Sequence, residues 1–523
     1  MRSIDYFDRG ALLYPSCTAV IDGEKRFSFE EVRELTLRIA SAMRAKGLAR
    51  QQAVALYSPN CADVLVVLLS IWRAEGVWTP VNTRNAVDAN AAYLDYTHCK
   101  WLFYHSSLAA DVAALKAKTP SLTHFVCIDR SNEGDPSLAE FVGDAKAEDW
   151  RDDFATPHGN PADIVGIFPT GGTTGPSKGV VVVNSGWGTM IETAQGAWDG
   201  RTDDPVCLTV APITHAAGPV ALASMSFGAT QVILPGFDPE NVLRTIEARK
   251  VTHMFLPPTA LYGLLDCPAL GRYDTSSLRL FLLAGSPVAP ERLKRAVEVF
   301  GPCMGQSYGQ VECPMIATWL PPEVVAAAAA GDHPERLASC GRPTRSVKIG
   351  ILDDDGNELG VGEVGEICAR GALVSKEYFE KPEATEEIRR FNWHHTGDVG
   401  RRDEHGYIYI VDRKKDMVVT GGFNVFSAEV ESAVMELAEV RECSVIGVPD
   451  QKWGEAVKAI VVLADGAALG EGDIIAHAKA RLGGVKAPKS VDFVGAIPRT
   501  AVGKVDKKTL RAPYWAGAGR SVN

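Results

Sequence analysis

Short apolar runs rich in strand-forming residues alternate with amphipathic helical stretches along the first half of the chain. Residues 29–46 carry apolar side chains at helical spacing and end before a glycine, which is typical of a helix. Strand patterns at 53–57 and 77–81 flank a largely apolar helix at 62–73, and the alternation continues to a helix at 290–300. Because helices that connect parallel strands cover the faces of a sheet, this pattern predicts an α/β fold.

The pattern changes after about Pro343, where short strands are separated by turns. These strands are expected at 347–352, 364–370 and 407–411. We therefore predict a large N-terminal domain over 1–412, built from helix-covered sheets and a small β-barrel-like subdomain. A dense charged segment at 412–416 precedes a C-terminal α+β domain over 413–523, since a chain of 523 residues exceeds one ordinary hydrophobic core.

The composition excludes several classes of protein. Hydrophobic residues make up 46% of the chain and charged residues 23%, as in an ordinary soluble globular protein. A net charge of −11 argues against a nucleic-acid partner. The N-terminus lacks the apolar core of a secretory signal, and the longest apolar run, at 64–72, is too short to span a bilayer. The eleven cysteines include no C-x-x-C pair, which indicates reduced thiols, so we expect a cytoplasmic protein without an integral membrane segment.

A loop rich in glycine and threonine occupies 170–179 between the apolar runs 164–168 and 180–183. Its backbone N–H groups, its hydroxyls and the ammonium of Lys178 suit the wrapping of a phosphate chain, because glycine lets the backbone approach closely. The spacing is not that of a Walker loop, since Gly179 follows the lysine and no helix signal comes next. We interpret the loop as phosphate-binding; the alternative is a flexible surface hairpin.

Five further positions suggest nucleotide chemistry. Tyr308 could stack on a nucleobase and Glu312 could hold Mg²⁺, which prefers oxygen ligands, although a buried tyrosine beside a surface glutamate fits this segment at least as well. Asp398 and Arg413 could contact a ribose, or be an ordinary turn aspartate and a solvated linker charge. Lys504 follows a glycine near the end of the chain and is either a surface lysine or a mobile charge that neutralises a carboxylate attacking a phosphate.

Taken together, these segments resemble the adenylate-forming superfamily of AMP-binding enzymes, and most of all its acyl- and aryl-CoA synthetases. The resemblance covers nearly the whole chain and rests on the segments 7–82, 170–179, 212–215, 308–312, 396–398, 412–431 and 503–504, in this order. It implies an ATP-dependent carboxylate–CoA ligase. The acid would become an acyl-adenylate with release of pyrophosphate, and the acyl group would then pass to coenzyme A with release of AMP.

The resemblance also implies roles for individual residues. The catalytic set would comprise Lys504, Thr173, Lys178, Glu312 and His215. Thr173, Thr174 and Lys178 would hold the phosphates, Glu312 would bind Mg²⁺, Asp398 and Arg413 would fix the ribose, and Lys504 would bridge the carboxylate and the α-phosphate. The nucleotide site would further include Thr170, Gly171, Gly172, Gly175, Ala284, Gly285, Ser286, Gln306, Ser307, Tyr308, Gly309 and Val311.

A C-terminal domain that rotates between the two half-reactions is a further implication of the resemblance. Lys415 falls at the hinge position of the family, and Gly421 and Gly422 would line the tunnel for the pantetheine of coenzyme A. Such a rotation is a gating step in which a few residues absorb the change in φ and ψ. His215 falls at the acyl pocket, where it could gate the pocket or contact the carboxylate; a packed loop histidine is an equal alternative.

Three departures from the pattern of the family are visible in the sequence. Val311 stands where relatives usually have threonine, and loss of a hydrogen bond to a charged group costs roughly 1.5–3 kcal/mol. Gly171 replaces a common serine, and the Pro176–Ser177 pair alters the usual placement of proline before the lysine. We expect these departures to affect efficiency rather than the class of reaction.

The acid and the acceptor are less constrained by the sequence. The candidate pocket positions are mostly small and include neither lysine nor arginine: His215, Ala216, Ala217, Gly218, Gly285, Ser286, Gly305, Gln306 and Cys313. They favour a medium- or long-chain fatty acid, an aromatic acid or an alicyclic acid over a dicarboxylate. A catalytically silent or weakened nucleotide-binding homologue and an enzyme with an acceptor other than coenzyme A are the alternatives. A peptide-synthetase module is disfavoured because only about 13 residues follow Leu510. A homodimer is possible.

Overall fold

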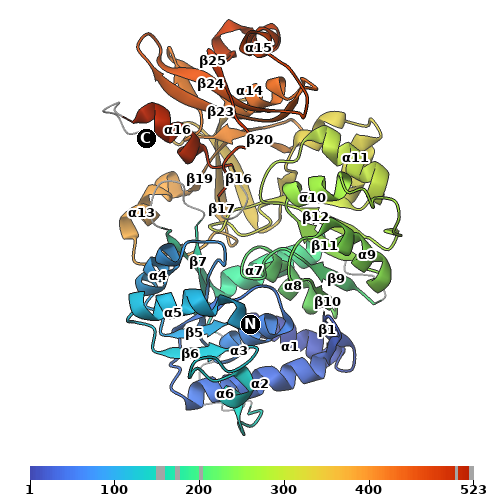
Figure 1. Cartoon of the computed structure of the whole chain (residues 1–523), viewed down its shortest axis with the longest axis vertical. Helices are drawn as coiled ribbons and strands as arrows, with labels where there is room; N and C mark the ends of the chain where they lie inside the picture. The colour runs from blue at the N-terminus through green and yellow to red at the C-terminus, as the bar shows by residue number, and fades with distance from the viewer. Residues whose placement is uncertain (149–159, 171–176, 199–203, 501–504, 517–523) are drawn as a thin grey trace. The chain divides into compact units, whose positions relative to one another are not determined.

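The computed structural model describes residues 1–148, 160–170, 177–198, 204–500 and 505–516 (Figure 1). It divides into two compact units. The first unit comprises Met1–Gly172, Pro176–Ile349 and Ala369–His394, and the second comprises Thr173–Gly175, Gly350–Cys368 and His395–Asn523. Because this grouping places 350–368 and 395–412 with the C-terminal residues, the expected division at 412/413 stays a prediction.

A nine-stranded sheet forms one half of the first unit. Its strands, in spatial order, are β15 (Arg342–Pro343), β14 (Thr318–Leu320), β13 (Met304–Tyr308), β12 (Leu280–Leu283), β11 (His253–Leu256), β9 (Val206–Thr209), β10 (Thr230–Ile233), β1 (Thr18–Asp22) and β2 (Lys25–Ser28). The strands from β13 to β1 run parallel, whereas β2 and β14 pair antiparallel at the two sides. The parallel strands must therefore place their carboxyl ends along one edge.

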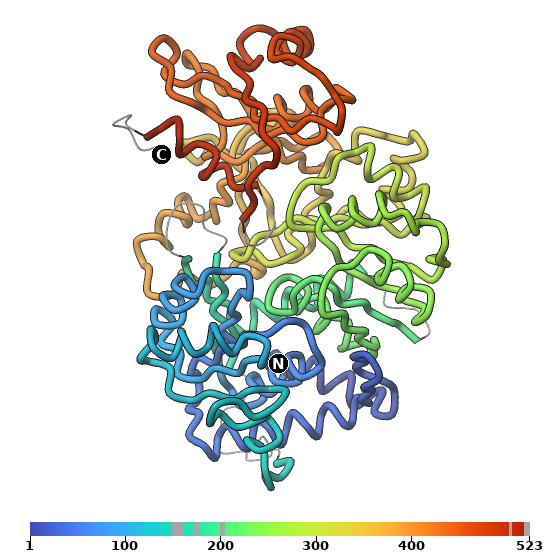
Figure 2. The backbone as a smooth tube through the Cα atoms, in the orientation of Figure 1, coloured from blue at the N-terminus to red at the C-terminus, as the bar shows by residue number. Residues whose placement is uncertain are grey.

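A seven-stranded sheet forms the other half of this unit. Its order is β18 (Glu377–Tyr378), β8 (Gly179–Val183), β7 (Ile164–Pro169), β4 (Val77–Pro80), β3 (Ala53–Tyr57), β5 (Trp101–Tyr104) and β6 (His124–Cys127). The strands from β7 to β6 are parallel, and β8 returns antiparallel to β7. The strands from β3 to β8 come from the part of the chain that is blue to teal in Figure 2, whereas β18, which pairs with β8, comes from the later, orange part.

Helices connect and cover these strands, which confirms the α/β class predicted from the sequence (Figure 1). They are α1 (Ser3–Leu13), α2 (Phe29–Ala45), α3 (Ala62–Arg73), α4 (Val87–Tyr96), α5 (Ala109–Lys118), α6 (Leu138–Val142), α7 (Asn184–Ala197), α8 (Ala217–Met225), α9 (Pro239–Arg249), α10 (Pro258–Leu265), α11 (Pro290–Phe300), α12 (Pro322–Ala329) and α13 (Pro382–Glu387). The helices expected at 29–46, 62–73 and 290–300 are α2, α3 and α11.

Helix α3 shows why an apolar segment of twelve residues becomes a helix here. Every residue of α3 except Asp63 is buried, so the helix is surrounded by protein rather than lying on the surface. Arg73 at its last turn is 1% exposed, and its guanidinium donates to both carboxylate oxygens of Asp8, at 2.6 and 3.1 Å. This bidentate pair satisfies a charge that would otherwise be costly to bury.

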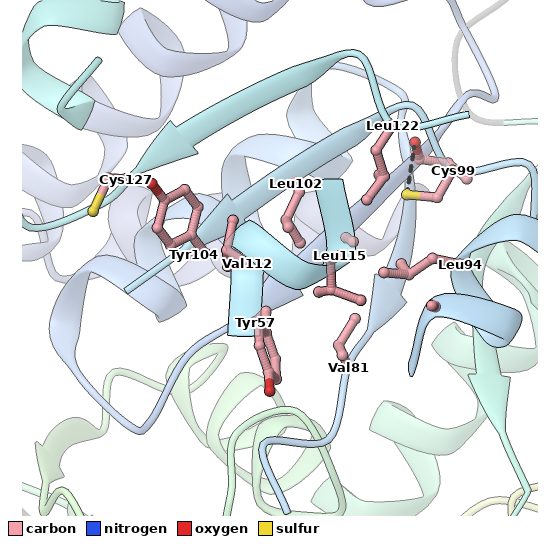
Figure 3. Packing of buried hydrophobic residues seen from close by; sticks show 13 residues of the cluster. Tyr57, Val81, Leu94, Cys99, Leu102, Tyr104, Val112, Leu115, Leu122 and Cys127 are labelled. Carbon is pink, nitrogen blue, oxygen red and sulfur yellow. Dashed lines mark hydrogen bonds between the residues drawn. The ribbon is translucent and has the colours of Figure 1, made fainter. Parts of the chain in front are cut away.

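One cluster of buried residues joins β3 and β5 to the helices beside them (Figure 3). Tyr57 of β3 and Leu102 of β5 are fully buried, as are Leu94 of α4 and Leu115 of α5. Full burial of a leucine side chain contributes about 1.5–3 kcal/mol relative to exposure, so this cluster fixes the helices on the sheet.

A four-stranded sheet follows the nine-stranded sheet in the chain. Its order is β16 (Val347–Leu352), β17 (Gly365–Gly371), β19 (His394–Arg402) and β20 (Ile408–Arg413). β19 and β20 are antiparallel, and their register places Asp398 opposite Arg413. The short strands expected after Pro343 are therefore present, with β19 in addition.

The last part of the chain forms a five-stranded sheet with helices, in line with the predicted α+β composition. Its strands are β22 (Phe423–Val425), β21 (Val418–Thr420), β24 (Gly454–Leu463), β23 (Val440–Asp450) and β25 (Ser490–Phe493), and its helices are α14 (Ser427–Val434), α15 (Glu471–Lys486) and α16 (Lys507–Trp515). Buried valines of β24 and α14 form its core with Ile474 of α15. Helix α16 was not predicted.

Across the part of the chain that the structure describes, we find no helix with the length and apolar character needed to cross a membrane.

Candidate active site

The carboxyl edge of the nine-stranded sheet collects three of the predicted segments. His215 follows β9, the stretch Ala284–Ser286 follows β12, and Glu312 lies four residues beyond the end of β13. These strands belong to one parallel set, and β12 pairs with β13 so that Leu283 lies opposite Gln306. In open α/β sheets, ligands bind outside the carboxyl ends of the strands, so these segments lie where a ligand site is expected.

The loop after β12 presents its backbone to this edge. Gly285 has a φ of 93°, in the left-handed region that favours glycine, and among the described residues other than its chain neighbours no atom lies within 4 Å of the position that its Cβ would take. Gly285 and Ser286 are exposed, whereas Ala284 is half-buried. A planar ring can therefore approach the backbone here.

The end of β13 carries buried polar groups that other described residues leave without a partner. Gln306 and Ser307 are 8% and 7% exposed, and neither Nε2 of the former nor Oγ of the latter has a hydrogen-bond partner among the described residues. Buried polar groups are normally hydrogen-bonded, so an orphaned pair at a strand end is a feature of a binding site. Tyr308, the last residue of the strand, is half-buried and accepts the N–H of Ala317 at its carbonyl (2.8 Å).

The turn after Tyr308 fixes the position of Glu312. A Cβ on Gly309 would lie 2.8 Å from the carbonyl oxygen of Cys313 and from backbone atoms of Met315, so only glycine fits there. The N–H of Gln310 donates to the carbonyl of Cys313 at 3.0 Å, which closes the turn around Val311 and Glu312. The family pattern at this position is thus realised as a tight turn.

Glu312 is held from two sides by residues far along the chain. Its carbonyl accepts the N–H of Ser375 at 2.7 Å, and its carboxylate Oε1 accepts the hydroxyl of Tyr378, also at 2.7 Å. Burial and the neighbouring Glu312 carboxylate raise the pKa of Tyr378, so the tyrosine remains a donor. Mg²⁺ prefers oxygen ligands, so the carboxylate of Glu312 fits a divalent cation.

Two hydrogen bonds join the two ends of the glycine- and threonine-rich loop. The N–H of Thr170 donates to the carbonyl of Lys178 (2.9 Å), and the N–H of Lys178 donates to Oγ1 of Thr170 (3.1 Å). The ammonium of Lys178 lies 4.9 Å from the ring centre of Tyr378. The predicted loop residues Gly171, Gly172, Thr173, Thr174 and Gly175 lie outside the described residues.

His215 is half-buried in the loop that leads into α8. Its Nδ1 lies 3.1 Å from the hydroxyl of Thr214, and burial together with the charge of Arg84 lowers the pKa of His215 to about 4. The imidazole is therefore neutral near pH 7. It can hydrogen-bond or gate a pocket, but it offers no positive charge to the carboxylate of a substrate.

The lowered pKa of His215 predicts a loss of stability in mild acid. Below pH 6.5 the imidazole of His215 becomes protonated in the unfolded chain, whereas in the folded protein it stays neutral down to about pH 4. The contribution of His215 to the free energy of unfolding is therefore fully present above pH 6.5 and is lost as the pH falls towards 4. Between pH 7 and pH 5 the free energy of unfolding should fall by about 2 kcal/mol more in the wild type than in His215→Asn. Urea unfolding at both pH values measures the difference, with the exposed His405→Asn as control; equal pH dependence in His215→Asn and the wild type would contradict it.

The second unit brings together the two predicted ribose residues. Arg413 and Asp398 are paired across β20 and β19, and Nε of the arginine lies 2.8 Å from Oδ1 of the aspartate. The Asp398 side chain is 5% exposed, and the Arg413 side chain is 45% exposed. The N–H of Asp398 donates to the hydroxyl of Thr396 (3.1 Å), so a local turn orients the carboxylate.

Glu366 was not predicted as a site residue, and it holds this turn from a neighbouring strand. Its Oε1 accepts the N–H of Gly397 at 3.0 Å, while Oε2 lies 3.1 Å from both Nδ1 of His395 and the ammonium of Lys414. Burial raises the pKa of Glu366, but His395 and Lys414 outweigh it and hold the pKa below its usual value. Glu366, Cys368 and His395 are close enough to one another for a metal site. However, Oε2 of Glu366, which would be a ligand, already pairs with the ammonium of Lys414.

Lys415, Gly421 and Gly422 lie around the start of the five-stranded sheet. The carbonyl of Lys415 accepts a guanidinium N–H of Arg511 (3.3 Å), and burial with the charge of Arg413 lowers the pKa of Lys415. Gly421 has a φ of 56°, and a Cβ there would lie 2.5 Å from the ring of Trp453, so glycine is required. Gly422 also has a positive φ, and Lys504 lies outside the described residues.

Comparisons with known proteins show which family this chain is similar to. The family model for AMP-binding enzymes matches residues 7–379, and the model for their C-terminal domain matches residues 429–504. The medium/long-chain-fatty-acid–CoA ligase FadD8 of Mycobacterium tuberculosis is 36% identical over 96% of this chain and 88% of its own length. The indoleacetate–CoA ligase of Aromatoleum aromaticum is 31% identical over 98% of each chain.

A solved structure extends the similarity to the fold. The amide bond synthetase McbA from Marinactinospora thermotolerans has a TM-score of 0.87 and 28% sequence identity, and the similarity covers 98% of this chain and 100% of that one. The chain therefore belongs to the AMP-binding enzymes, the adenylate-forming superfamily that its motifs resemble.

Proposed function

We propose that this protein is an ATP-dependent carboxylate–CoA ligase. It activates a carboxylic acid to an acyl-adenylate with release of pyrophosphate, and it then transfers the acyl group to coenzyme A with release of AMP. Two CoA ligases, FadD8 and the indoleacetate enzyme, are similar to this chain over nearly its full length, which supports the reaction class.

The convergence of Glu312 and Lys178 on Tyr378 is the observation that carries the proposal. The carboxylate of Glu312, which suits a divalent cation, accepts the hydroxyl of Tyr378 at 2.7 Å. The ammonium of Lys178, which suits phosphates, lies 4.9 Å from the centre of the same ring. Glu312 follows a strand of the nine-stranded sheet and Lys178 precedes a strand of the seven-stranded sheet, so the fold rather than sequence proximity brings them together. Phosphoryl chemistry uses such groups to position the phosphates and to offset their charge.

In the first half-reaction, the chain's own residues hold the nucleotide and lower the repulsion between two anions. The loop 170–179, with its Lys178, binds the phosphates, and Tyr308 packs against the adenine. The carboxylate of Asp398 accepts hydrogen bonds from the ribose hydroxyls. Lys504 then lies between the carboxylate and the α-phosphate, where its ammonium offsets the negative charge that accumulates during attack. Mg²⁺ at Glu312 supplies further positive charge to the phosphate oxygens when it is bound.

In the second half-reaction, the thiol of coenzyme A attacks the acyl carbonyl and AMP leaves. Lys504 must leave the site to admit the thiol, so we propose that the C-terminal residues rotate about Lys415. Gly421 and Gly422 then line the passage for pantetheine, and the positive φ of both residues is compatible with a backbone that carries no side chain there.

The acid carries an apolar body. Ala217 is buried at the start of α8, and the half-buried Ala216 precedes it beside the neutral His215. These groups offer no charge to a second carboxylate. Medium- or long-chain fatty acids, aromatic acids and alicyclic acids fit this chemistry, and the activities named for the two CoA ligases fall within this range.

A panel of acids tests the proposed function. Purified protein with ATP and Mg²⁺ should release pyrophosphate only when a suitable acid is present, and mass spectrometry should detect the matching thioester only when coenzyme A is added. Protein that binds ATP but releases no pyrophosphate with fatty, aromatic or alicyclic acids would instead be a silent nucleotide-binding homologue.

An acceptor other than coenzyme A is the second candidate, and the similarity to the amide bond synthetase favours it. The same assay separates the two. Pyrophosphate release with an acid would show that the protein forms an acyl-adenylate. If an added amine then yields an amide while coenzyme A yields no thioester, the assignment of coenzyme A as the acceptor is wrong.

A further inference from the structure

Residues 375–379 return to the first unit from far along the chain and are fastened to the strand that follows Lys178. β18 pairs antiparallel with β8, with Tyr378 opposite Val180, and the N–H of Phe379 donates to the carbonyl of Gly179 at 2.7 Å. β18 is the edge strand of the seven-stranded sheet and has only two residues.

The same short segment is fastened to Glu312. The N–H of Ser375 donates to the carbonyl of Glu312, and the Tyr378 hydroxyl donates to its carboxylate, both at 2.7 Å. Glu312 follows a strand of the other sheet. The segment therefore ties a carboxylate that follows one sheet to the phosphate-binding loop of the other.

The side chain of Tyr378 makes both connections at once. It is 7% exposed, its hydroxyl faces Glu312, and its ring lies under the ammonium of Lys178 at 4.9 Å. That distance is within the ~6 Å reach of a cation–π interaction. Two groups of opposite charge are thus each held by a different part of one neutral side chain.

We infer that Tyr378 is a positioning residue for the metal and phosphate site: its hydroxyl orients the Glu312 carboxylate towards a divalent cation, and its ring holds the Lys178 ammonium towards the phosphates. The inference rests on the proposed function, which assigns those two roles. With Oε1 occupied by the hydroxyl, the carboxylate has one orientation, and Oε2 can face the cation. Partners that orient a metal ligand in this way commonly change metal affinity by about 10–100-fold when they are removed.

The test compares two tyrosine-to-phenylalanine variants. Tyr378→Phe removes the hydroxyl and keeps the ring over which Lys178 lies. Tyr57→Phe is the matched control, because the hydroxyl of Tyr57 also donates to a carboxylate, Oδ2 of Asp111 at 2.7 Å, from another strand of the same sheet. Thermal melts of both variants report any general loss of stability.

Binding of Mn²⁺ in the presence of ATP, followed by electron paramagnetic resonance, is the decisive measurement. Tyr378→Phe should weaken Mn²⁺ binding by about 10-fold relative to the wild type, whereas Tyr57→Phe should not change it. The Mg²⁺ concentration needed for half-maximal pyrophosphate release should rise equally, while KM for the acid stays constant. Mn²⁺ binding in Tyr378→Phe that equals the wild type would overturn the inference.

A third variant tests the role of the ring. Tyr378→Leu removes both contacts, so we expect weaker ATP binding than in Tyr378→Phe, and equal ATP binding in the two would overturn the role for Lys178. The outcomes also separate this inference from the proposed function. A wild type that binds Mn²⁺ and ATP but activates no acid overturns the function, whereas an active enzyme with unchanged Mn²⁺ binding in Tyr378→Phe overturns only the inference.

Discussion

Lys504→Ala should lower the rate of acyl-adenylate formation by about 10²-fold or more, because removal of one preorganised group that stabilises developing charge typically has an effect of this size. The same variant should convert a supplied acyl-adenylate and coenzyme A to thioester at nearly the wild-type rate, since we propose that Lys504 is absent from the site in that step. Pyrophosphate release and thioester formation, each measured in a single turnover, separate the two half-reactions.

Lys508→Ala is the control for this experiment, because Lys508 is an exposed lysine of α16 four residues away. It should leave both half-reactions unchanged. An equal loss of both half-reactions in Lys504→Ala would contradict the division of labour between them. The match of the C-terminal family model extends as far as residue 504, so the lysine lies within the family pattern although it lies outside the described residues.

Local patterns predicted much of the first unit. The apolar segment at 62–73 is helix α3, and the strands expected at 53–57 and 77–81 are β3 and β4, the latter ending one residue earlier. These elements are buried, so the spacing of their apolar residues reflects the packing directly. Tyr308 and the turn to Glu312 also lie at the end of a parallel strand, as the β–α pattern before them suggests.

The residues that the sequence did not reveal act across long separations. Tyr378 lies on a strand of two residues, too short for any periodicity, and its partner Glu312 is 66 positions away. Glu366 accepts the N–H of Gly397 from a different strand, and the residues next to Glu366 in the sequence do not predict that contact. Such contacts depend on tertiary structure, which a pattern of neighbouring residues does not encode.

Small residues were also ambiguous. Gly218 and Gly305 were assigned to the acid pocket because small side chains leave room. A Cβ on Gly218 would lie 2.2 Å from the carbonyl oxygen of Ile213, and one on Gly305 would lie 2.6 Å from the ring of Trp319. Close packing of the protein itself thus accounts for both glycines, and they provide no measure of pocket volume.

Asp398→Asn should raise KM for ATP by about 10–100-fold, which corresponds to the loss of one charge-assisted hydrogen bond worth roughly 1.5–3 kcal/mol. The amide keeps the shape of the side chain but removes the charge that Arg413 pairs with at 2.8 Å. Because we assign the carboxylate to the ribose, KM for the acid and for coenzyme A should change little. Initial rates at varied ATP, acid and coenzyme A measure each effect.

Asp354→Asn is the matched control, because Asp354 also pairs with a basic residue of the 413–415 segment. Its carboxylate lies 2.7 Å from the ammonium of Lys414, but the side chain is 87% exposed. Exposed ion pairs contribute little, so this variant should keep the KM for ATP of the wild type. If Asp398→Asn also kept it while folding normally, the buried pair with Arg413 would be a structural contact of β19 and β20, and the ribose would have to be bound by other groups.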